Sequence, residues 1–211
     1  AAGCKSRAVV TDMNQPVAPA IGNAVEVTEA LKVLTDPKPE QRLCQLTIAL
    51  TGELLELAGV SSSAEEGGRS ALSVLTSGKA AEKFVAMVAE LGGPMDVLDG
   101  GPMAHLPVAP VIQPVFPCEG GVVEAIDGQI LGNLVVQLGG GRTTPQDEID
   151  PRVGLSQVAG LGETVDEHRP FAFVHAAKLS DVEAAAPAVQ AAFQLGSNAA
   201  IPPLIHGRLD G

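Results

Sequence analysis

The sequence predicts a mixed α/β fold followed by a compact α+β subdomain. From about residue 20 to residue 91, apolar residues recur at helical spacing, whereas beyond residue 106 short β-type runs alternate with two helical segments. Between them, the segment GGPMDVLDGGPMAHLPVAP (92–110) is rich in glycine and proline, which is typical of a linker. We therefore expect two domains, residues 1–105 and residues 106–211.

The first part is expected to begin with a short buried strand at residues 8–10, followed by four helices. A buried parallel strand needs neighbours on both sides, which must come from later strands or from a longer chain of which this is the back end. Ser63 and Glu66 have capping-box spacing for the third helix, which Gly67 and Gly68 weaken. The stripes expected to pack into the core are Ile21, Ala24, Val25, Thr28 and Leu31; Leu43, Leu46, Leu50, Leu54 and Leu57; and Ala81, Phe84, Val88 and Leu91.

The second part is expected to hold four strands, at residues 111–116, 121–126, 154–158 and 171–175, and helices at about residues 128–138 and 180–195. A Ser180/Glu183 capping box opens the second helix. A last run, residues 203–206, can return as an edge strand. One face of the second helix carries Val182, Ala185, Val189 and Phe193.

Residues 160–178, GLGETVDEHRPFAFVHAAK, are similar to one half of a biotinyl- or lipoyl-carrier domain. Lys178 falls near the position of the lysine that carriers modify. A carrier needs that lysine on a tight turn between strands, however, and the expected helix begins two residues later. We therefore expect a barrel-like, hammerhead geometry without a swinging arm.

Composition excludes several classes of function. The 211 residues carry a net charge of −12 and a pI of about 4.6, so phosphate backbones and anionic lipids are repelled. Aromatic residues make up only 2%, which argues against stacking on single-stranded nucleic acid. No apolar run approaches the length of a membrane span. We expect neither nucleic acid nor membrane as a partner, and a cytoplasmic location.

The cysteines and histidines show no ligand spacing. Cys4, Cys44 and Cys118 form no CxxC pair and are expected to be free thiols. The histidines lack HxH and HxxxH spacing, so a histidine metal site is not expected. His175 ends an apolar strand and is interpreted as a structural residue rather than a catalytic base. The four histidines are His105, His168, His175 and His206.

The segment LGGGRTTPQDEID (138–150) looks at first like a phosphate loop. A phosphate cradle needs a strand, a glycine loop and then a helix, so that helix N-terminal amides meet the anion. Here the helix precedes the glycines, and proline and acidic residues follow them. This order and charge argue against an autonomous cradle.

Polar residues follow the first expected strand. Asp12, Asn14 and Gln15 lie on the turn that leaves it, where α/β proteins place ligand sites. The alternative, which the residues alone favour, is a network of turn and helix-cap hydrogen bonds.

Four ordered motifs then identify a family. TDMNQP…GNAVEVTEAL, GKAAEKFVAMV, LGGGRTTPQDEIDPRVGL and GETVDEHRPFAFVHA resemble the C-terminal half of the thymidine and pyrimidine-nucleoside phosphorylases over essentially the whole chain. The resemblance implies a pentosyltransferase that converts thymidine and phosphate to thymine and 2-deoxyribose 1-phosphate. It also implies a homodimer. Residues 1–105 would then be the C-terminal part of an α/β phosphate-binding domain and residues 106–211 the family's C-terminal domain.

The departures from the family are equally informative. The phosphate loop and the residues that hold the base lie upstream in the family and have no counterpart here, so no catalytic residue is assigned. The resemblance therefore implies an inactive C-terminal fragment. Alternatives are a stand-alone binding or scaffold module, or a piece of a phosphorylase that also accepts uridine.

Two features carry over residue by residue from the resemblance. Val17 and Ala20, through main-chain carbonyls, and Glu29, through its carboxylate, match part of a potassium site that some bacterial relatives have; no other cofactor is implied. Gly139, Gly140, Gly141 and Arg142 match a closure loop. We expect this loop to be poorly ordered when the domain on which it closes is absent.

Overall fold

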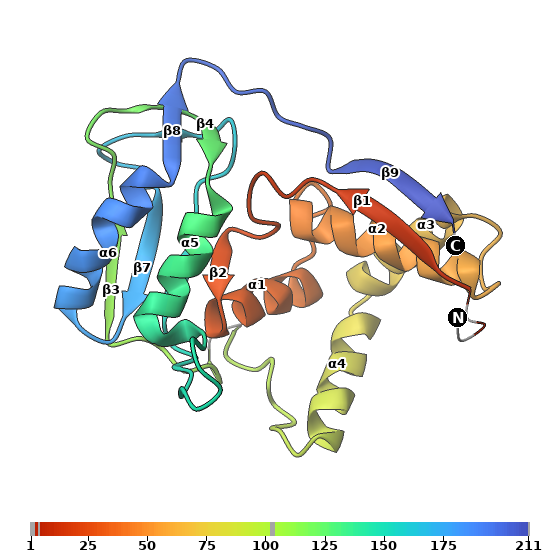
Figure 1. The fold of residues 1–211 in the computed structure, drawn as a ribbon. Helices are drawn as coiled ribbons and strands as arrows, with labels where there is room; N and C mark the ends of the chain where they lie inside the picture. The colour runs from red at the N-terminus through yellow and green to blue at the C-terminus, as the bar shows by residue number, and fades with distance from the viewer. Residues whose placement is uncertain (1–2, 4, 102–103, 211) are drawn as a thin grey trace. The chain divides into compact units, whose positions relative to one another are not determined.

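The computed structural model describes residues 3, 5–101 and 104–210, so Cys4 and two residues of the expected linker lie outside the described residues. Helices and strands are mixed along the chain (Figure 1), which confirms the α/β plus α+β class. The helices are α1 Ala24–Thr35, α2 Arg42–Leu57, α3 Ala64–Thr76, α4 Lys79–Glu90, α5 Gly128–Val135, the π-helix η1 Val136–Gly140, and α6 Leu179–Ala191. The strands are β1 Arg7–Thr11, β2 Ala20–Gly22, β3 Val111–Val115, β4 Gly121–Ile126, β5 Gly154–Ser156, β6 Thr164–Val165, β7 Ala172–Ala176, β8 Phe193–Gly196 and β9 Ile205–Asp210.

The chain folds into two compact units that are discontinuous in sequence. The first unit contains Ala1–Asp12, Ala30–His105 and Pro203–Gly211, and the second contains Met13–Glu29 and Leu106–Pro202. The chain passes from one to the other after His105, where the glycine- and proline-rich segment lies. It also crosses at three further positions, after Asp12, after Glu29 and after Pro202.

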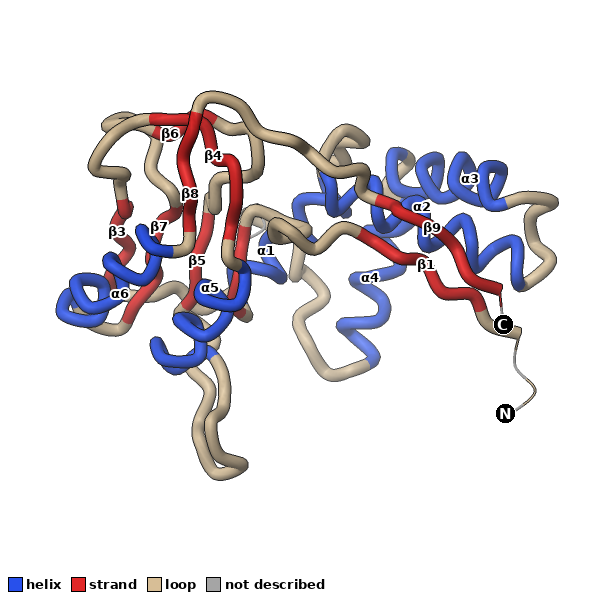
Figure 2. Tube along the Cα trace, turned by 45° about the horizontal axis from the view of Figure 1, so that its top comes forward, coloured by secondary structure: helices blue, strands red, loops and turns tan. Residues whose placement is uncertain are grey.

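In the first unit, β1 pairs antiparallel with β9 over five residue pairs (Figure 2). The expectation of a buried parallel strand is wrong here: the burial of β1 alternates along the strand, and Val10 is 47% exposed. Alternation of this kind is typical of an antiparallel strand with one face against the protein. The strand expected at residues 203–206 does form, as β9 Ile205–Asp210, but it pairs with β1 in the first unit and not with the second part of the chain as expected.

The predicted helical stripes have different outcomes. On α1, Ala24, Val25, Thr28 and Leu31 are buried as expected, whereas Ile21 of the same predicted stripe lies on β2 and is partly buried. On α2 the leucine stripe is wrong, because Leu50 and Leu54 are 45% and 64% exposed while Cys44, Gly52 and Glu53 are buried. α4 has no buried residue, and Leu91 at its end is 81% exposed, so its stripe is not a core face within the described residues.

Glycines explain why α2 turns this face inward. A Cβ atom on Gly52 would lie 2.3 Å from the carbonyl oxygen of Ala64, and one on Gly67 would lie 2.7 Å from the carbonyl oxygen of Gly52. α2 and α3 therefore approach each other more closely than side chains allow. The glycines that weaken α3 as a helix are required by this contact, and Ser63 offsets them by accepting a hydrogen bond from the Glu66 amide at 3.2 Å.

Buried charge ties the strand pair to α2. Glu53 is only 4% exposed, and its carboxylate is paired with Arg7 at 2.5 Å and also with Arg208. Arg7 reaches Glu56 as well, at 2.8 Å. Because Arg7 lies on β1 and Arg208 on β9, one carboxylate holds both strands to the helix. Removing both arginines would leave the charge of Glu53 uncompensated in the interior.

The second unit contains a four-stranded sheet in the order β2-β5-β7-β3 and a three-stranded sheet in the order β6-β4-β8, both antiparallel. These are open sheets, and the described strands close no barrel; several are only two or three residues long. Val123, Leu131, Leu155, Val174 and Val189 are fully or almost fully buried in the core that the sheets share with α5 and α6.

The end of the second unit differs from the expectation in two details. α6 begins after Lys178, so Ser180 lies inside the helix and the expected Ser180/Glu183 box is not its cap. Phe193 belongs to β8 rather than to the helix, because the chain leaves α6 after Ala191. Lys178 is exposed and precedes a helix, which supports the rejection of a carrier hairpin. Over the part of the chain that the structure describes, no helix has both the length and the apolar character needed to cross a membrane.

We predict that Gly52→Ala lowers the free energy of unfolding by about 1–3 kcal/mol, because the added methyl group collides with the main chain of α3. Gly132→Ala is the matched control: Gly132 also lies inside a helix, but a Cβ there meets nothing within 4 Å. That substitution should be neutral or stabilise by up to about 1 kcal/mol. Urea denaturation followed by circular dichroism measures both, and equal effects would contradict the close helix contact.

Candidate functional site around the glycine-rich loop

Two of the sequence motifs meet in the second unit. The side-chain amide of Asn23 donates to the carbonyl oxygen of Gly140 at 2.8 Å, and the amide of Ala24 donates to the carbonyl oxygen of Pro151 at 3.0 Å. The start of α1 is thus attached to both ends of the glycine-rich loop. We take this region, residues 13–29 together with residues 138–163, as the candidate site.

At each of the three loop positions the backbone geometry requires glycine for a different reason. Gly139 adopts a positive φ of 98°, which ends the helical path of η1. A Cβ atom on Gly140 would lie 2.7 Å from Cγ1 of Val135, and one on Gly141 would lie 2.8 Å from Cγ2 of Val136. The triple glycine therefore serves a tight reversal over the end of α5.

Beyond the glycines, Asp147 organises the loop. Its carboxylate accepts hydrogen bonds from the amides of Thr143 and Thr144, both at 2.8 Å, and from both hydroxyl groups, at 2.6 Å. Arg142 donates through Nε to the carbonyl oxygen of Asp147 at 3.1 Å. The threonine hydroxyls and then the amides hold the pKa of Asp147 far below its usual value. The loop donors that could have met a phosphate are therefore occupied by the loop's own carboxylate.

The same contacts bear on the order of the loop. The amide of Asp150 donates to the carbonyl oxygen of Gly139 at 2.9 Å, and Arg152 closes a two-point ion pair on Asp150 that lowers the pKa of this carboxyl group. The expectation of a poorly ordered loop is wrong in this respect, because contacts within the chain hold its shape. Its role in closure stays a prediction.

Several hydrogen bonds and an ion pair hold the polar turn that follows β1. Asp12 is buried and paired with Arg42 at 3.1 Å in the first unit. Gln15, 5% exposed, accepts a hydrogen bond from the amide of Leu161 at 3.0 Å in the second unit. The carbonyl oxygen of Pro19 accepts from the amide of Val158 at 3.1 Å. The interpretation as a structural hydrogen-bond network accounts for Asp12 and Gln15.

His175 and Ser156 form a pair on neighbouring strands. The hydroxyl of Ser156 lies 2.8 Å from Nε2 of His175, which is 5% exposed. Burial lowers the pKa of His175, which favours the neutral form of the ring. These features support the interpretation of His175 as a structural residue.

The residues matching a potassium site all lie in residues 13–29. Val17 is half-buried in the loop between β1 and β2, Ala20 is the buried first residue of β2, and Glu29 is half-buried on α1. Two main-chain carbonyls and one carboxylate are hard oxygen donors of the kind alkali and alkaline-earth cations accept. These donor types are ones that a potassium ion accepts, and the site itself stays a prediction.

The other residues that could bind a metal ion do not form a cluster among the described residues. Among the described residues, no three His, Cys, Asp or Glu side chains are placed to hold a metal ion. Cys44 is buried and Cys118 exposed, and both are free thiols, as expected. Burial is the main cause that raises the pKa of Cys44.

The residue pairs that build the site escaped the sequence analysis. The contacts of Asn23 with Gly140 and of Gln15 with Leu161 join positions 117 and 146 residues apart. Nothing in a local pattern signals such pairs. The Asp147 network is local, and a Thr-Thr-Pro-x-Asp turn could have indicated it.

Comparison with known proteins identifies relatives of this chain. Residues 122–196 match the model of the pyrimidine nucleoside phosphorylase C-terminal domain. The chain is 43% identical over 209 residues to thymidine phosphorylase of Burkholderia cenocepacia strain HI2424, covering 99% of this chain and 48% of that protein. Identity to the Burkholderia lata enzyme is 41% over 208 residues, with 99% and 47% covered. The chain matches the C-terminal half of the thymidine and pyrimidine-nucleoside phosphorylases. It spans about half the length of these curated relatives.

We predict that Gln15→Leu weakens the attachment of the turn, because the buried amide of Leu161 loses its acceptor. The free energy of unfolding should fall by about 1–3 kcal/mol, and the Leu161 amide should exchange its hydrogen faster in NMR. Gln15→Glu keeps an acceptor and should protect that amide better than Gln15→Leu does. Unchanged exchange in Gln15→Leu would contradict the assigned contact.

Replacing Thr143 and Thr144 together by valine should raise the pKa of Asp147 toward its usual value, because two hydroxyl donors are lost while two amides remain. A depressed carboxyl pKa stabilises the loop above the unfolded pKa, and that contribution is lost as the pH falls through the folded value. In the wild type the loop should thus keep its shape well into the acid range. A carbon-13 NMR titration of the carboxyl group measures the shift, and an unchanged pKa would show that the hydroxyls contribute nothing.

Proposed function

We propose that this chain is the C-terminal part of a thymidine phosphorylase, a pentosyltransferase of pyrimidine nucleoside salvage that acts on thymidine and phosphate. The observation that supports it is the 43% identity over 99% of the chain. In the reaction, an oxygen of phosphate bonds to C1′ of the sugar as the bond from C1′ to the base breaks. The bonding electrons leave with thymine, which takes up a proton, and 2-deoxy-D-ribose 1-phosphate is formed.

The chain alone is proposed to be inactive. Such a displacement depends on groups that hold phosphate and stabilise charge developing between sugar and base. In the described residues the threonine donors of the glycine-rich loop are directed at Asp147, and Arg142 and Arg152 bond to Asp147 and Asp150 within the loop. The phosphate-binding and base-binding groups are therefore proposed to come from the half that these relatives have in addition.

The contribution of this chain is proposed to be support and closure. The carbonyl oxygens of Val17 and Ala20 and the carboxylate of Glu29 would hold a potassium ion, whose charge would add to the positive potential that a phosphate needs. Residues 139–142 would move as a lid during closure. We propose in addition that the intact enzyme is a cytoplasmic homodimer that binds neither nucleic acid nor membrane.

A chimera tests the proposal. The part of the B. cenocepacia enzyme that precedes its matched half is joined to this chain, and thymine release from thymidine and phosphate is followed by chromatography. We expect turnover within about tenfold of the intact relative, roughly 1.4 kcal/mol in activation free energy, and none from this chain alone.

The controls separate the alternatives. Turnover by the isolated 211-residue chain at the rate of the intact relative would contradict the fragment proposal. A chimera that is folded by circular dichroism yet inactive would instead favour a stand-alone binding or scaffold module. Assaying uridine beside thymidine tests for the broader specificity.

A further inference from the structure

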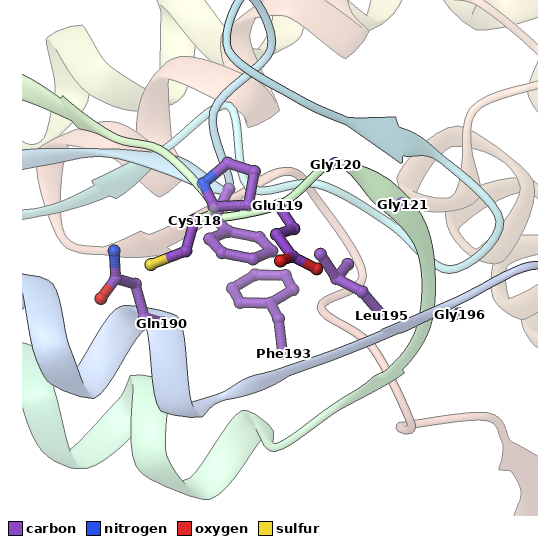
Figure 3. A pocket seen from close by; sticks show the side chains of 10 residues that line it. Cys118, Glu119, Gly120, Gly121, Gln190, Phe193, Leu195 and Gly196 are labelled. Carbon is purple, nitrogen blue, oxygen red and sulfur yellow. The ribbon is translucent and has the colours of Figure 1, made fainter.

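A cavity of about 490 Å³ lies in the second unit, away from the contacts described so far (Figure 3). It is formed by the turn that joins β3 to β4, the last turn of α6, and β8. Small-molecule sites in proteins typically measure about 300–1,000 Å³. The volume is therefore sufficient for a ligand as large as a nucleoside.

The floor of the cavity is aromatic. Phe171 and Phe193 are stacked with ring centroids 4.5 Å apart and an interplanar angle of 18°, and both are buried. They are two of only five phenylalanines in a chain that has no Trp or Tyr. Leu195 adds an aliphatic wall. A flat ligand with an apolar face suits this floor.

The rim supplies acceptors. The amide nitrogen of Gln190 donates to the carbonyl oxygen of Phe116 at 3.0 Å, which fixes the carboxamide and leaves Oε1 as an acceptor. Glu119 adds a carboxylate, and in the view of Figure 3 Gln190 and Cys118 lie toward one end of the pocket with Leu195 toward the other. No lysine or arginine is among the described residues that line it. An anion would be repelled, whereas N–H and O–H donors would be matched.

We propose that this pocket binds an uncharged nucleoside, with the flat base against the Phe171–Phe193 floor and its N–H or hydroxyl groups donating to Gln190 and Glu119. The choice of thymidine as the probe rests on the proposed function. The binding experiment uses this chain without turnover, so its failure would leave the chimera result unchanged, and an inactive chimera would leave the binding result unchanged.

The test is a titration of the glycine-selectively nitrogen-15-labelled chain with thymidine, followed by NMR. Gly120, Gly121 and Gly196 line the pocket, whereas Gly59 and Gly78 do not and serve as internal references. We expect saturable shifts of the three pocket glycines in the millimolar range. Thymidine 5′-monophosphate should bind at least about threefold more weakly, because its charge faces Glu119 without a compensating cation.

Gln190→Leu should weaken thymidine binding about fivefold through the loss of the rim acceptor. Gln129→Leu is the matched control, an exposed glutamine on α5 outside the pocket, and should bind as the wild type does. If Gln190→Leu does not fold, the comparison of thymidine with its monophosphate decides alone. The proposal is overturned if the pocket glycines do not shift with thymidine, or if the monophosphate binds as well as the nucleoside.

Discussion

The candidate site depends on the close approach of Gly22 and Gly154, which face each other in the pairing of β2 with β5. A Cβ atom on Gly154 would lie 2.6 Å from the carbonyl oxygen of Ile21, and one on Gly22 would lie 2.9 Å from that of Val153. Both residues also have φ values near 150°, which side chains disfavour. β2 and β5 can pair at this point only because both positions are glycine, and α1 begins two residues after Gly22, at Ala24. That start places Asn23 and Ala24 within reach of the glycine-rich loop.

A close approach between glycine main chains also holds the first unit together. Gly52 and Gly67 let α2 and α3 meet main chain to main chain, and the next residue, Glu53, gathers Arg7 and Arg208 from the two strands. A helix face built from a glycine and a carboxylate cannot be the leucine stripe that hydrophobic periodicity selects. This explains why Leu50 and Leu54 are exposed in this chain although their spacing is that of a core face.

Sequence reasoning succeeded where structure is local. The Ser63 cap, the start of α5 after Asp127, the span of β4 and the buried face of α6 all follow from neighbours within a few residues. It failed where the partner is distant. The sequence alone cannot show whether a glycine has open space beside it, as Gly132 does, or lies against another main chain, as Gly52 does. For the candidate site the residue types and the family were within reach, whereas the bonds that assemble it were not.

The glycine-rich loop shows how charge separates a supporting part from a catalytic one. Both amides and the Thr143 hydroxyl donate to Oδ2 of Asp147 and the Thr144 hydroxyl donates to Oδ1, so donors that could bind a phosphate are taken up by this carboxylate. Displacing the carboxylate would leave its charge beside the incoming anion, in a chain whose net charge is already −12. A loop occupied in this way keeps its own shape, because the hydrogen bond from the Asp150 amide to the carbonyl oxygen of Gly139 closes it and Asp147 takes up its threonine donors. Those donors are therefore not available to hold a phosphate.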